Sequence, residues 1–103
     1  MTGYRFNFRA SPKESQIEKT AVEHAVAAGW DNLKIGFDGW PDRLFWRQGV
    51  FVFIEYKRPG EAPRINQERK IKRLLDQGCW VGVCDTVAES DAVLAEVWEA
   101  RGL

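Results

Sequence analysis

The 103-residue sequence contains few of the residues that build metal–thiolate sites or disulfide frameworks. It has two cysteines, one histidine (His24) and no Cys-x-x-Cys motif, so a structural zinc site is not expected. Cys79 and Cys84 lie five residues apart in one predicted strand, which is too far for a disulfide bond between them. We therefore expect two reduced cysteines, as is usual for cytoplasmic proteins.

The sequence also lacks net charge and long apolar runs. The 15 Lys and Arg residues balance the 15 Asp and Glu residues, which argues against a protein that coats nucleic acid indiscriminately. No apolar run approaches the ~20 residues that span a bilayer, and the N-terminus lacks the apolar core of a signal peptide, so no membrane partner is expected. The length fits one domain over residues 1–103.

Hydrophobic periodicity and turn residues predict an α/β domain with the element order αβββαβα. Ser11 and Pro12 form a helix-start signal, and Gly29 closes that first helix. In the second helix, Ile65, Ile71, Leu74 and Leu75 are expected to face inward. The expected elements are a helix over 12–28, strands over 33–37, 43–46 and 50–57, a helix over 64–77, a strand over 79–84 and a helix from 87 onward.

Two features near the N-terminus leave alternatives open. Tyr4, Phe6 and Phe8 alternate with polar residues, so residues 1–10 are an extra strand or an arm that pairs at a sheet edge, exchanges with a second copy or touches a phosphate backbone. Glu18 lies within the apolar stripe of the first helix, where a carboxylate normally needs a partner. Alternatively, Ser15 is the N-cap and Glu18 only completes its capping box.

A short hairpin carries the residues that most narrow the function. The apolar run 50–54 predicts a strand that continues into Glu55 and Lys57, which point to the same face because side chains alternate along a strand. If Gln48-Gly49 is a two-residue turn, antiparallel pairing brings Asp42 opposite Glu55. Two carboxylates and an ammonium group on one patch predict a metal site with a catalytic lysine beside it.

The residues alone also permit two other interpretations of this hairpin. Like charges directly opposite each other destabilise a sheet, and Lys57 would partly neutralise them as an ordinary salt bridge at a strand edge. A three-residue turn would place Asp42 opposite Ile54 and separate the two carboxylates. The choice of turn therefore decides whether this site exists.

The chain resembles the virus-type replication-repair nuclease (VRR-NUC) family, part of the PD-(D/E)XK nuclease superfamily. The resemblance spans roughly residues 15–97 and rests on an ordered set of motifs: Glu18, Gly39-Trp40-Pro41-Asp42, Glu55-Tyr56-Lys57 and Gln67. The E-x-K triplet alone has little specificity, whereas the whole set over matching secondary structure is specific. Trp40 and Tyr56 are bulkier than the family pattern suggests, and neither removes a ligand. The resemblance implies a restriction-endonuclease-like fold, with a central mixed sheet flanked by helices.

The resemblance also implies a metal site of hard oxygen ligands. Asp42 and Glu55 would bind Mg²⁺ or Mn²⁺ with help from the Tyr56 carbonyl, and Glu18 would complete or support that shell. Such ligands suit either of these ions. The implied activity is metal-dependent hydrolysis of phosphodiester bonds in DNA.

Two further residues acquire catalytic roles from the resemblance. Lys57 would orient or activate the attacking water and stabilise charge on the phosphate. Gln67 would position Lys57 or the water, or reach the scissile backbone. Three rival functions remain: a non-cleaving DNA-binding module, a nuclease for RNA or single strands, and a structural adaptor that does not respond to metal.

Basic residues around the predicted site are candidates for contact with DNA phosphates, with salt-dependent binding. Lys34 and Arg43 have an equally good interpretation as surface salt bridges, and Trp40 is a candidate for stacking on an unpaired base. The candidates for phosphate contact are Lys34, Arg43, Arg58, Arg64, Lys70 and Arg73.

The resemblance finally implies an assembly and a substrate. Stand-alone family members look like homodimers that cut branched DNA, Holliday junctions especially, because two sites related by a two-fold axis match a four-way junction. The expected location is the cytoplasm of a bacterium or of a virus-infected host cell.

Overall fold

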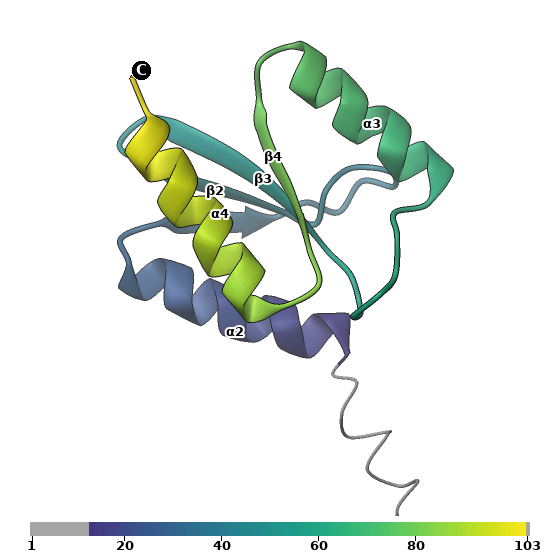
Figure 1. Cartoon of the computed structure of the whole chain (residues 1–103), viewed down its shortest axis with the longest axis horizontal. Helices are drawn as coiled ribbons and strands as arrows, with labels where there is room; N and C mark the ends of the chain where they lie inside the picture. Colours follow the sequence, from purple (N-terminus) through teal and green to yellow (C-terminus); the bar gives the residue numbers. More distant parts are fainter. Residues whose placement is uncertain (1–12, 103) are drawn as a thin grey trace, which may run out of the picture.

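The computed structural model describes residues 13–102. Its elements follow the predicted order αβββαβα (Figure 1). The interpretations of Tyr4, Phe6 and Phe8 as a strand or arm, and of Ser11-Pro12 as a helix start, fall outside these residues. The elements are α2 (Glu14–Ala27), β1 (Asp31–Lys34), β2 (Arg43–Arg47), β3 (Val50–Tyr56), α3 (Ile65–Asp76), β4 (Trp80–Cys84) and α4 (Val87–Ala100).

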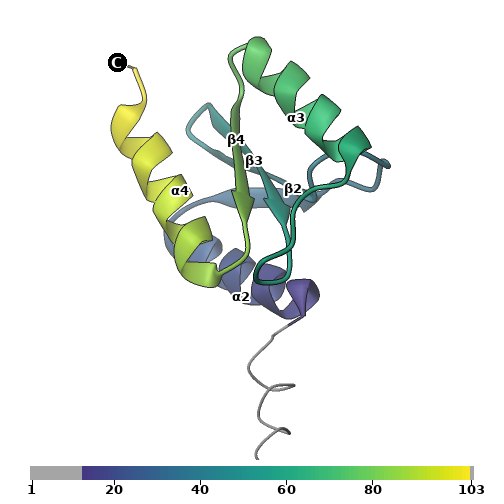
Figure 2. The ribbon, with the colours of Figure 1, turned by 45° about the vertical axis from the view of Figure 1, so that its right-hand side comes forward.

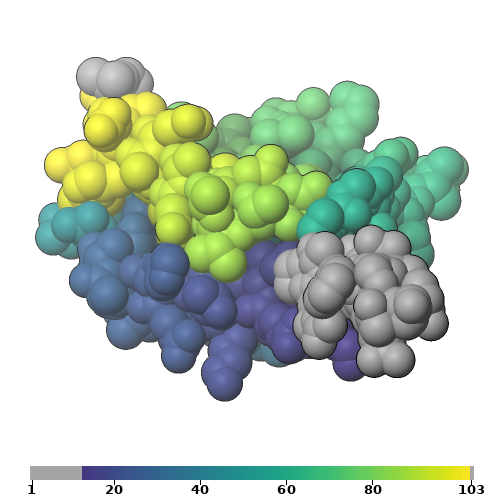
Figure 3. Space-filling view, turned by 60° about the horizontal axis from the view of Figure 1, so that its bottom comes forward, coloured from purple at the N-terminus to yellow at the C-terminus, as the bar shows by residue number. Residues whose placement is uncertain are grey.

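The strands form one mixed sheet in the order β1-β2-β3-β4. β1, β2 and β3 pair antiparallel, whereas β3 and β4 run parallel and are joined through α3. α2 and α4 pack against each other and against the sheet, while α3 lies apart from them beside β4 (Figures 1 and 2). In the space-filling view, in which the bottom of Figure 1 is turned forward, α2 and α4 form a continuous surface (Figure 3). The predicted central mixed sheet flanked by helices is confirmed.

The two-residue periodicity of β3 separates the hydrophobic core from the candidate site. Val52, Ile54 and Tyr56 are fully buried on the face toward α2 and α4, and the Tyr56 hydroxyl lies 2.8 Å from Ser90 Oγ of α4. Glu55 points to the opposite face and is still only 1% exposed. A buried carboxylate on the sheet face away from the core needs partners, which the site provides.

The turn between β2 and β3 settles the register of the hairpin. Arg43 pairs with Ile54 and Arg47 pairs with Val50, which leaves Gln48 and Gly49 as a two-residue turn. Both turn residues have positive φ, 47° and 82°, as a turn that matches the twist of a hairpin requires. The predicted turn is therefore confirmed, and the three-residue alternative is wrong.

The start of α2 excludes one sequence interpretation. Lys13 is the N-cap, and its backbone N–H donates to the Gln16 side chain at 3.2 Å. Ser15 lies inside the helix, so the interpretation of Ser15 as the N-cap is wrong. Glu18 is buried and is free to bind groups elsewhere in the fold.

Other departures from the sequence prediction arise where packing leaves apolar groups uncovered. Ile65 and Leu75 of α3, predicted to face inward, are 65% and 52% exposed, because α3 packs beside β4 at one side of the sheet. The first strand ends at Lys34, before the end of its predicted range. The Ile35 N–H still donates to Asp42 O at 2.8 Å, and the chain turns away after this bond.

Cys79 and Cys84 are both free, as expected. Within residues 13–102, no helix is long and apolar enough to cross a membrane.

Candidate active site

Asp42 is held in place from both sides at the entrance to β2. Its Oδ2 accepts a hydrogen bond from the Tyr56 backbone N–H at 2.7 Å, and its carbonyl accepts one from Ile35 N–H at 2.8 Å. Burial raises the pKa of Asp42, an effect that the Tyr56 hydrogen bond opposes and the nearby Glu18 reinforces. The carboxylate is thus fixed in a position where holding a negative charge is unfavourable without a cation.

Glu55 is the buried centre of the site. Its Oε2 accepts from Lys57 Nζ at 3.0 Å and from Gln67 Nε2 at 2.9 Å. Its Oε1 is the one buried side-chain polar atom within residues 13–102 without a hydrogen-bond partner. Burial raises the pKa of Glu55 despite the lowering effect of Lys57. A buried acceptor without a hydrogen-bond partner destabilises the fold, because its desolvation is not compensated unless another group binds it.

Lys57 and Gln67 reach Glu55 from different parts of the chain. The Lys57 backbone N–H donates to Cys84 O at 2.9 Å, which extends the pairing of β3 and β4 and places its side chain, 11% exposed, beside Glu55. Gln67 accepts from the Arg64 N–H at 2.9 Å and so caps the start of α3 while its amide nitrogen binds Glu55. The structure therefore brings together Asp42, Glu55, Lys57 and Gln67, with Gln67 bound to Glu55 rather than to Lys57.

Glu18 forms a second cluster beside the first. Its carboxylate accepts from Arg43 Nε at 2.6 Å and from Lys34 Nζ at 3.1 Å. Arg43 also donates to Asn32 Oδ1 at 2.8 Å. The prediction that this buried carboxylate needs a partner is confirmed. Lys34 and Arg43 thus form the salt bridges that the sequence analysis gave as an alternative. The two clusters adjoin, because Arg43 directly follows Asp42 in the chain.

The donor set fits a Mg²⁺ or Mn²⁺ ion. Among residues 13–102, no three His, Cys, Asp or Glu side chains gather closely enough to enclose a metal ion by themselves. Mg²⁺ commonly binds through one or two carboxylates and retains several waters, so Asp42, Glu55 and the Tyr56 carbonyl suffice. A cation there would satisfy Glu55 Oε1 and favour the charged form of both carboxylates. Glu18, bound by two cations, lies outside this minimal set.

The remaining predicted DNA contacts lie on the loop before α3 and along that helix, from Arg64 at its N-cap to Arg73 in its last turn. Arg58 and Arg73 are exposed. Arg64 Nη2 lies 3.5 Å from Asp38 Oδ1 in an exposed ion pair. Lys70 Nζ lies 4.5 Å from the centre of the Trp40 ring. These cations lie on the loop and helix that also carry Gln67, which would place a basic surface next to the carboxylates.

The sequence analysis missed the tether that fixes the loop before Asp42. Asn66 Nδ2 donates to Asp38 Oδ2 at 3.2 Å, and a side chain on Gly39 would lie 3.6 Å from the Asn66 carbonyl oxygen. Gly39 has φ of 81°, a conformation that glycine adopts without strain. The signal that could have revealed this tether is the position of Asn66, a polar residue directly before Gln67.

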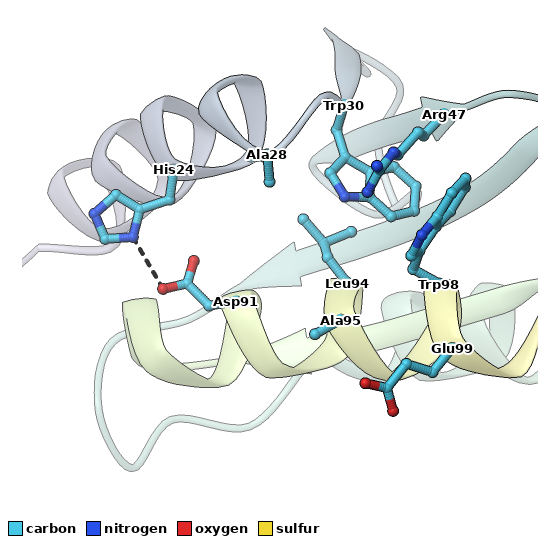
Figure 4. Close-up of a pocket in the computed structure, with 10 residues that line it drawn as sticks. His24, Ala28, Trp30, Arg47, Asp91, Leu94, Ala95, Trp98 and Glu99 are labelled. Carbon is cyan, nitrogen blue, oxygen red and sulfur yellow. Dashed lines mark hydrogen bonds and ion pairs between the residues drawn. The ribbon is translucent and has the colours of Figure 1, made fainter.

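A separate recess lies between α2 and α4, away from these carboxylates. It measures 390 Å³ and is lined by Trp30, Arg47 and Trp98, with His24 and Asp91 at one end (Figure 4). His24 Nδ1 and Asp91 Oδ2 are 2.9 Å apart, and both side chains are about half exposed. His24 is thus a helix-surface residue that links α2 to α4 and lies outside the candidate site.

Comparisons with known proteins agree with this fold. The model of the VRR-NUC domain family matches residues 7–88. A solved structure described as a VRR_NUC domain is 29% identical in sequence and superposes with a TM-score of 0.73. The match covers 80% of this chain and 94% of that chain. No curated protein matches the chain.

Proposed function

Because the chain belongs to the VRR-NUC family of nuclease domains, we propose that it is a metal-dependent endonuclease that hydrolyses phosphodiester bonds in DNA. The observation that best supports this proposal is the unpartnered, buried Glu55 Oε1 beside Asp42 and Lys57. A structural role gives no reason to bury an acceptor without a donor. A metal site does, because the ion becomes the partner of that oxygen.

Asp42, Glu55 and the Tyr56 carbonyl are the proposed ligands for Mg²⁺ or Mn²⁺. The Tyr56 backbone N–H orients Asp42, and Gln67 and Lys57 orient Glu55, so each carboxylate is held before the ion arrives. A divalent ion bound there supplies Lewis acidity toward a phosphoryl oxygen and lowers the pKa of a bound water.

Lys57 is the proposed catalytic ammonium. Its Nζ is fixed 3.0 Å from a proposed ligand oxygen, where it can bind the attacking water or a phosphate oxygen and stabilise negative charge that develops there. Gln67 acts through Glu55 as a positioning residue. Glu18 supports the site by holding Arg43 and Lys34 beside it, where these cations would meet the DNA backbone as it approaches.

We further propose that the protein acts as a homodimer on branched DNA. Support for a second copy comes from Phe51 and Trp80, which are 52% and 44% exposed and line a recess of 350 Å³ with Arg101, at the end of α4. Two active sites related by a two-fold axis would suit the similar symmetry of a four-way junction. Sedimentation at micromolar concentration should give a dimer that Trp80→Asp dissociates, and a monomeric wild type would contradict the assembly.

Cleavage of labelled four-way junction, flap, duplex and single-stranded DNA tests the proposed activity. Wild type should cut with Mg²⁺ or Mn²⁺ and not in EDTA, and Lys57→Ala should lose cleavage. Lys72→Ala is the matched control, because Lys72 is exposed on α3 and pairs with Asp76 in an i,i+4 arrangement. Junction binding without cleavage in either metal would instead establish a non-cleaving binding module. Equal cleavage by wild type and Lys57→Ala would refute the assigned mechanism.

A further inference from the structure

Phe37 is the most exposed large apolar side chain among residues 13–102, at 76%. Single exposed apolar residues are common on protein surfaces, so exposure alone assigns no role. Phe37, however, lies on the loop between β1 and β2, five residues before the proposed metal ligand Asp42. A chain of five residues reaches at most about 17 Å, which corresponds to about five nucleotides along one DNA strand. The ring therefore lies close to any DNA held at the site.

Phe37 borders an apolar recess on the same side of the sheet as Glu55. The recess has a volume of 340 Å³. Phe53 lines it and lies two residues before Glu55 in β3, so both side chains point to the same face. The other apolar side chains that line the recess are Leu33, Ile35, Phe37, Trp40 and Leu44.

The loop that carries Phe37 is fixed by contacts at several points. The Trp40 N–H donates to Phe37 O at 3.2 Å and closes a four-residue turn. The Asp38 carboxylate accepts from Asn66 at 3.2 Å, which ties the turn to the start of α3. The backbone that carries Phe37 is thus held in a defined position, so little backbone entropy remains to be lost when a ligand stacks on the ring.

Cations surround this aromatic surface. Lys34 lines the recess with a side chain that is 61% exposed, and Lys70 lies 4.5 Å from the centre of the Trp40 ring. The Trp40 ring also contacts Phe53, with ring centres 6.1 Å apart, so the predicted stacking residue Trp40 is already engaged on the protein. Of the three aromatic side chains that line the recess, Phe37 is the exposed one. An exposed ring among cations is the arrangement that binds single-stranded nucleic acid.

We propose that Phe37 and the adjoining recess form a base-stacking site that receives an unpaired nucleobase of the DNA near the cleaved phosphate. Lys34 and Lys70 would hold the flanking phosphates while the ring stacks on the base. The site would favour DNA with unpaired or readily unstacked bases, such as a branch point, over continuous duplex. Its DNA ligand rests on the proposed function, although the stacking itself needs neither metal nor cleavage.

Fluorescence anisotropy in EDTA tests this proposal without any cleavage. The probes are a fully paired DNA duplex and the same duplex with a central run of mismatched bases, each at the same salt concentration. Phe37→Ala should weaken binding to the mismatched DNA by about 5- to 150-fold and leave binding to the paired duplex unchanged. Phe37→Trp should retain the preference. Val26→Ala removes an exposed apolar side chain of α2 (56% exposed) that lines neither this recess nor the proposed interface between copies, and it should keep the wild-type ratio of the two affinities.

The possible outcomes separate this site from the nuclease activity. If Phe37→Ala keeps the wild-type ratio, or Val26→Ala lowers it equally, the stacking site is refuted while metal-dependent cleavage stands unaffected. If Phe37 determines the ratio in a protein that never cuts DNA, the stacking site is established and the nuclease assignment fails. If wild type binds neither DNA, the stacking site is refuted, and the cleavage assay with Mg²⁺ or Mn²⁺ decides the nuclease assignment separately. Thermal unfolding should show each variant folded, since these side chains are largely exposed.

Discussion

Replacement of Lys57 by alanine should separate the stability of the site from its chemistry. The Lys57 and Glu55 side chains are 11% and 2% exposed, with their charged atoms 3.0 Å apart. Removing one partner of a buried ion pair costs about 3–5 kcal/mol of unfolding free energy, because the other charge stays buried. Gln67 still donates to Glu55, and Glu55 can take up a proton, so we expect a value near the lower end, about 3 kcal/mol.

In a domain of this size, such a loss lowers the melting temperature by about 12–24 °C. The loss of unfolding free energy in Lys57→Ala should be smaller at acidic pH, because Glu55 is then protonated and leaves no unpaired buried charge. Mn²⁺ or Mg²⁺ should restore more stability to Lys57→Ala than it adds to wild type, since the ion replaces the missing positive charge. Cleavage should remain absent even when the ion has restored the fold.

Urea unfolding at several pH values, with and without metal, measures these quantities. The matched control is Lys72→Ala, whose exposed pair with Asp76 contributes about 0.3–0.5 kcal/mol at most. A loss below about 1 kcal/mol in Lys57→Ala would mean that solvent already screens the pair. A metal response smaller than that of wild type would show that Lys57 helps to hold the ion, and would refute the division of roles proposed above.

Two further predictions concern the groups on either side of the sheet. Burial raises the pKa of Asp42 in the folded protein above the ordinary carboxylate pKa of about 4. The stability that Asp42 contributes to the metal-free protein is therefore fully present below about pH 4. This stability is lost as the pH rises through the raised pKa. Asp42→Asn should therefore be more stable than wild type near neutral pH in EDTA and should show no stabilisation by Mn²⁺. Urea unfolding measures both quantities. A wild type that is more stable than Asp42→Asn in EDTA would refute the buried-charge argument. On the core face, Tyr56→Phe and Ser90→Ala should each cost about 1–3 kcal/mol, because each leaves a buried hydroxyl unpaired, whereas the double variant should be close to wild type. A double-mutant cycle measures this coupling, and strictly additive losses of unfolding free energy would contradict the hydrogen bond. Cleavage should be unchanged in all three variants.

The hairpin shows how much of the site follows from local sequence. Gln48-Gly49 adopts the two-residue turn with positive φ that its residues favour, and this turn alone determines that β2 and β3 pair in the register that brings Asp42 toward Glu55. The alternation of β3 then assigns Glu55 and Lys57 to one face. Turn chemistry and strand periodicity depend on neighbouring residues, so the sequence favours this register, whereas the structure excludes the three-residue alternative.

The partners of the buried charges depend on the tertiary structure. Local pattern places Glu18 on an inward stripe, but it does not distinguish a metal ligand from the partner of Arg43 and Lys34, because all three residues come from separate elements. Likewise, Gln67 meets Glu55 only because the crossover sets the start of α3 against that face of the sheet.

Exposure of apolar groups also required the fold. Periodicity predicted that Ile65 and Leu75 face inward and did not mark Phe37, yet all three are exposed. A helix can present an apolar stripe and still leave part of it uncovered when, like α3, it packs mainly beside one strand at the side of the sheet. The sequence by itself determined the order of the elements and the residues that share a strand face, and it favoured the hairpin register that the structure adopts. The tertiary structure decided which faces are covered and which charges pair, because those depend on segments distant in sequence packing together.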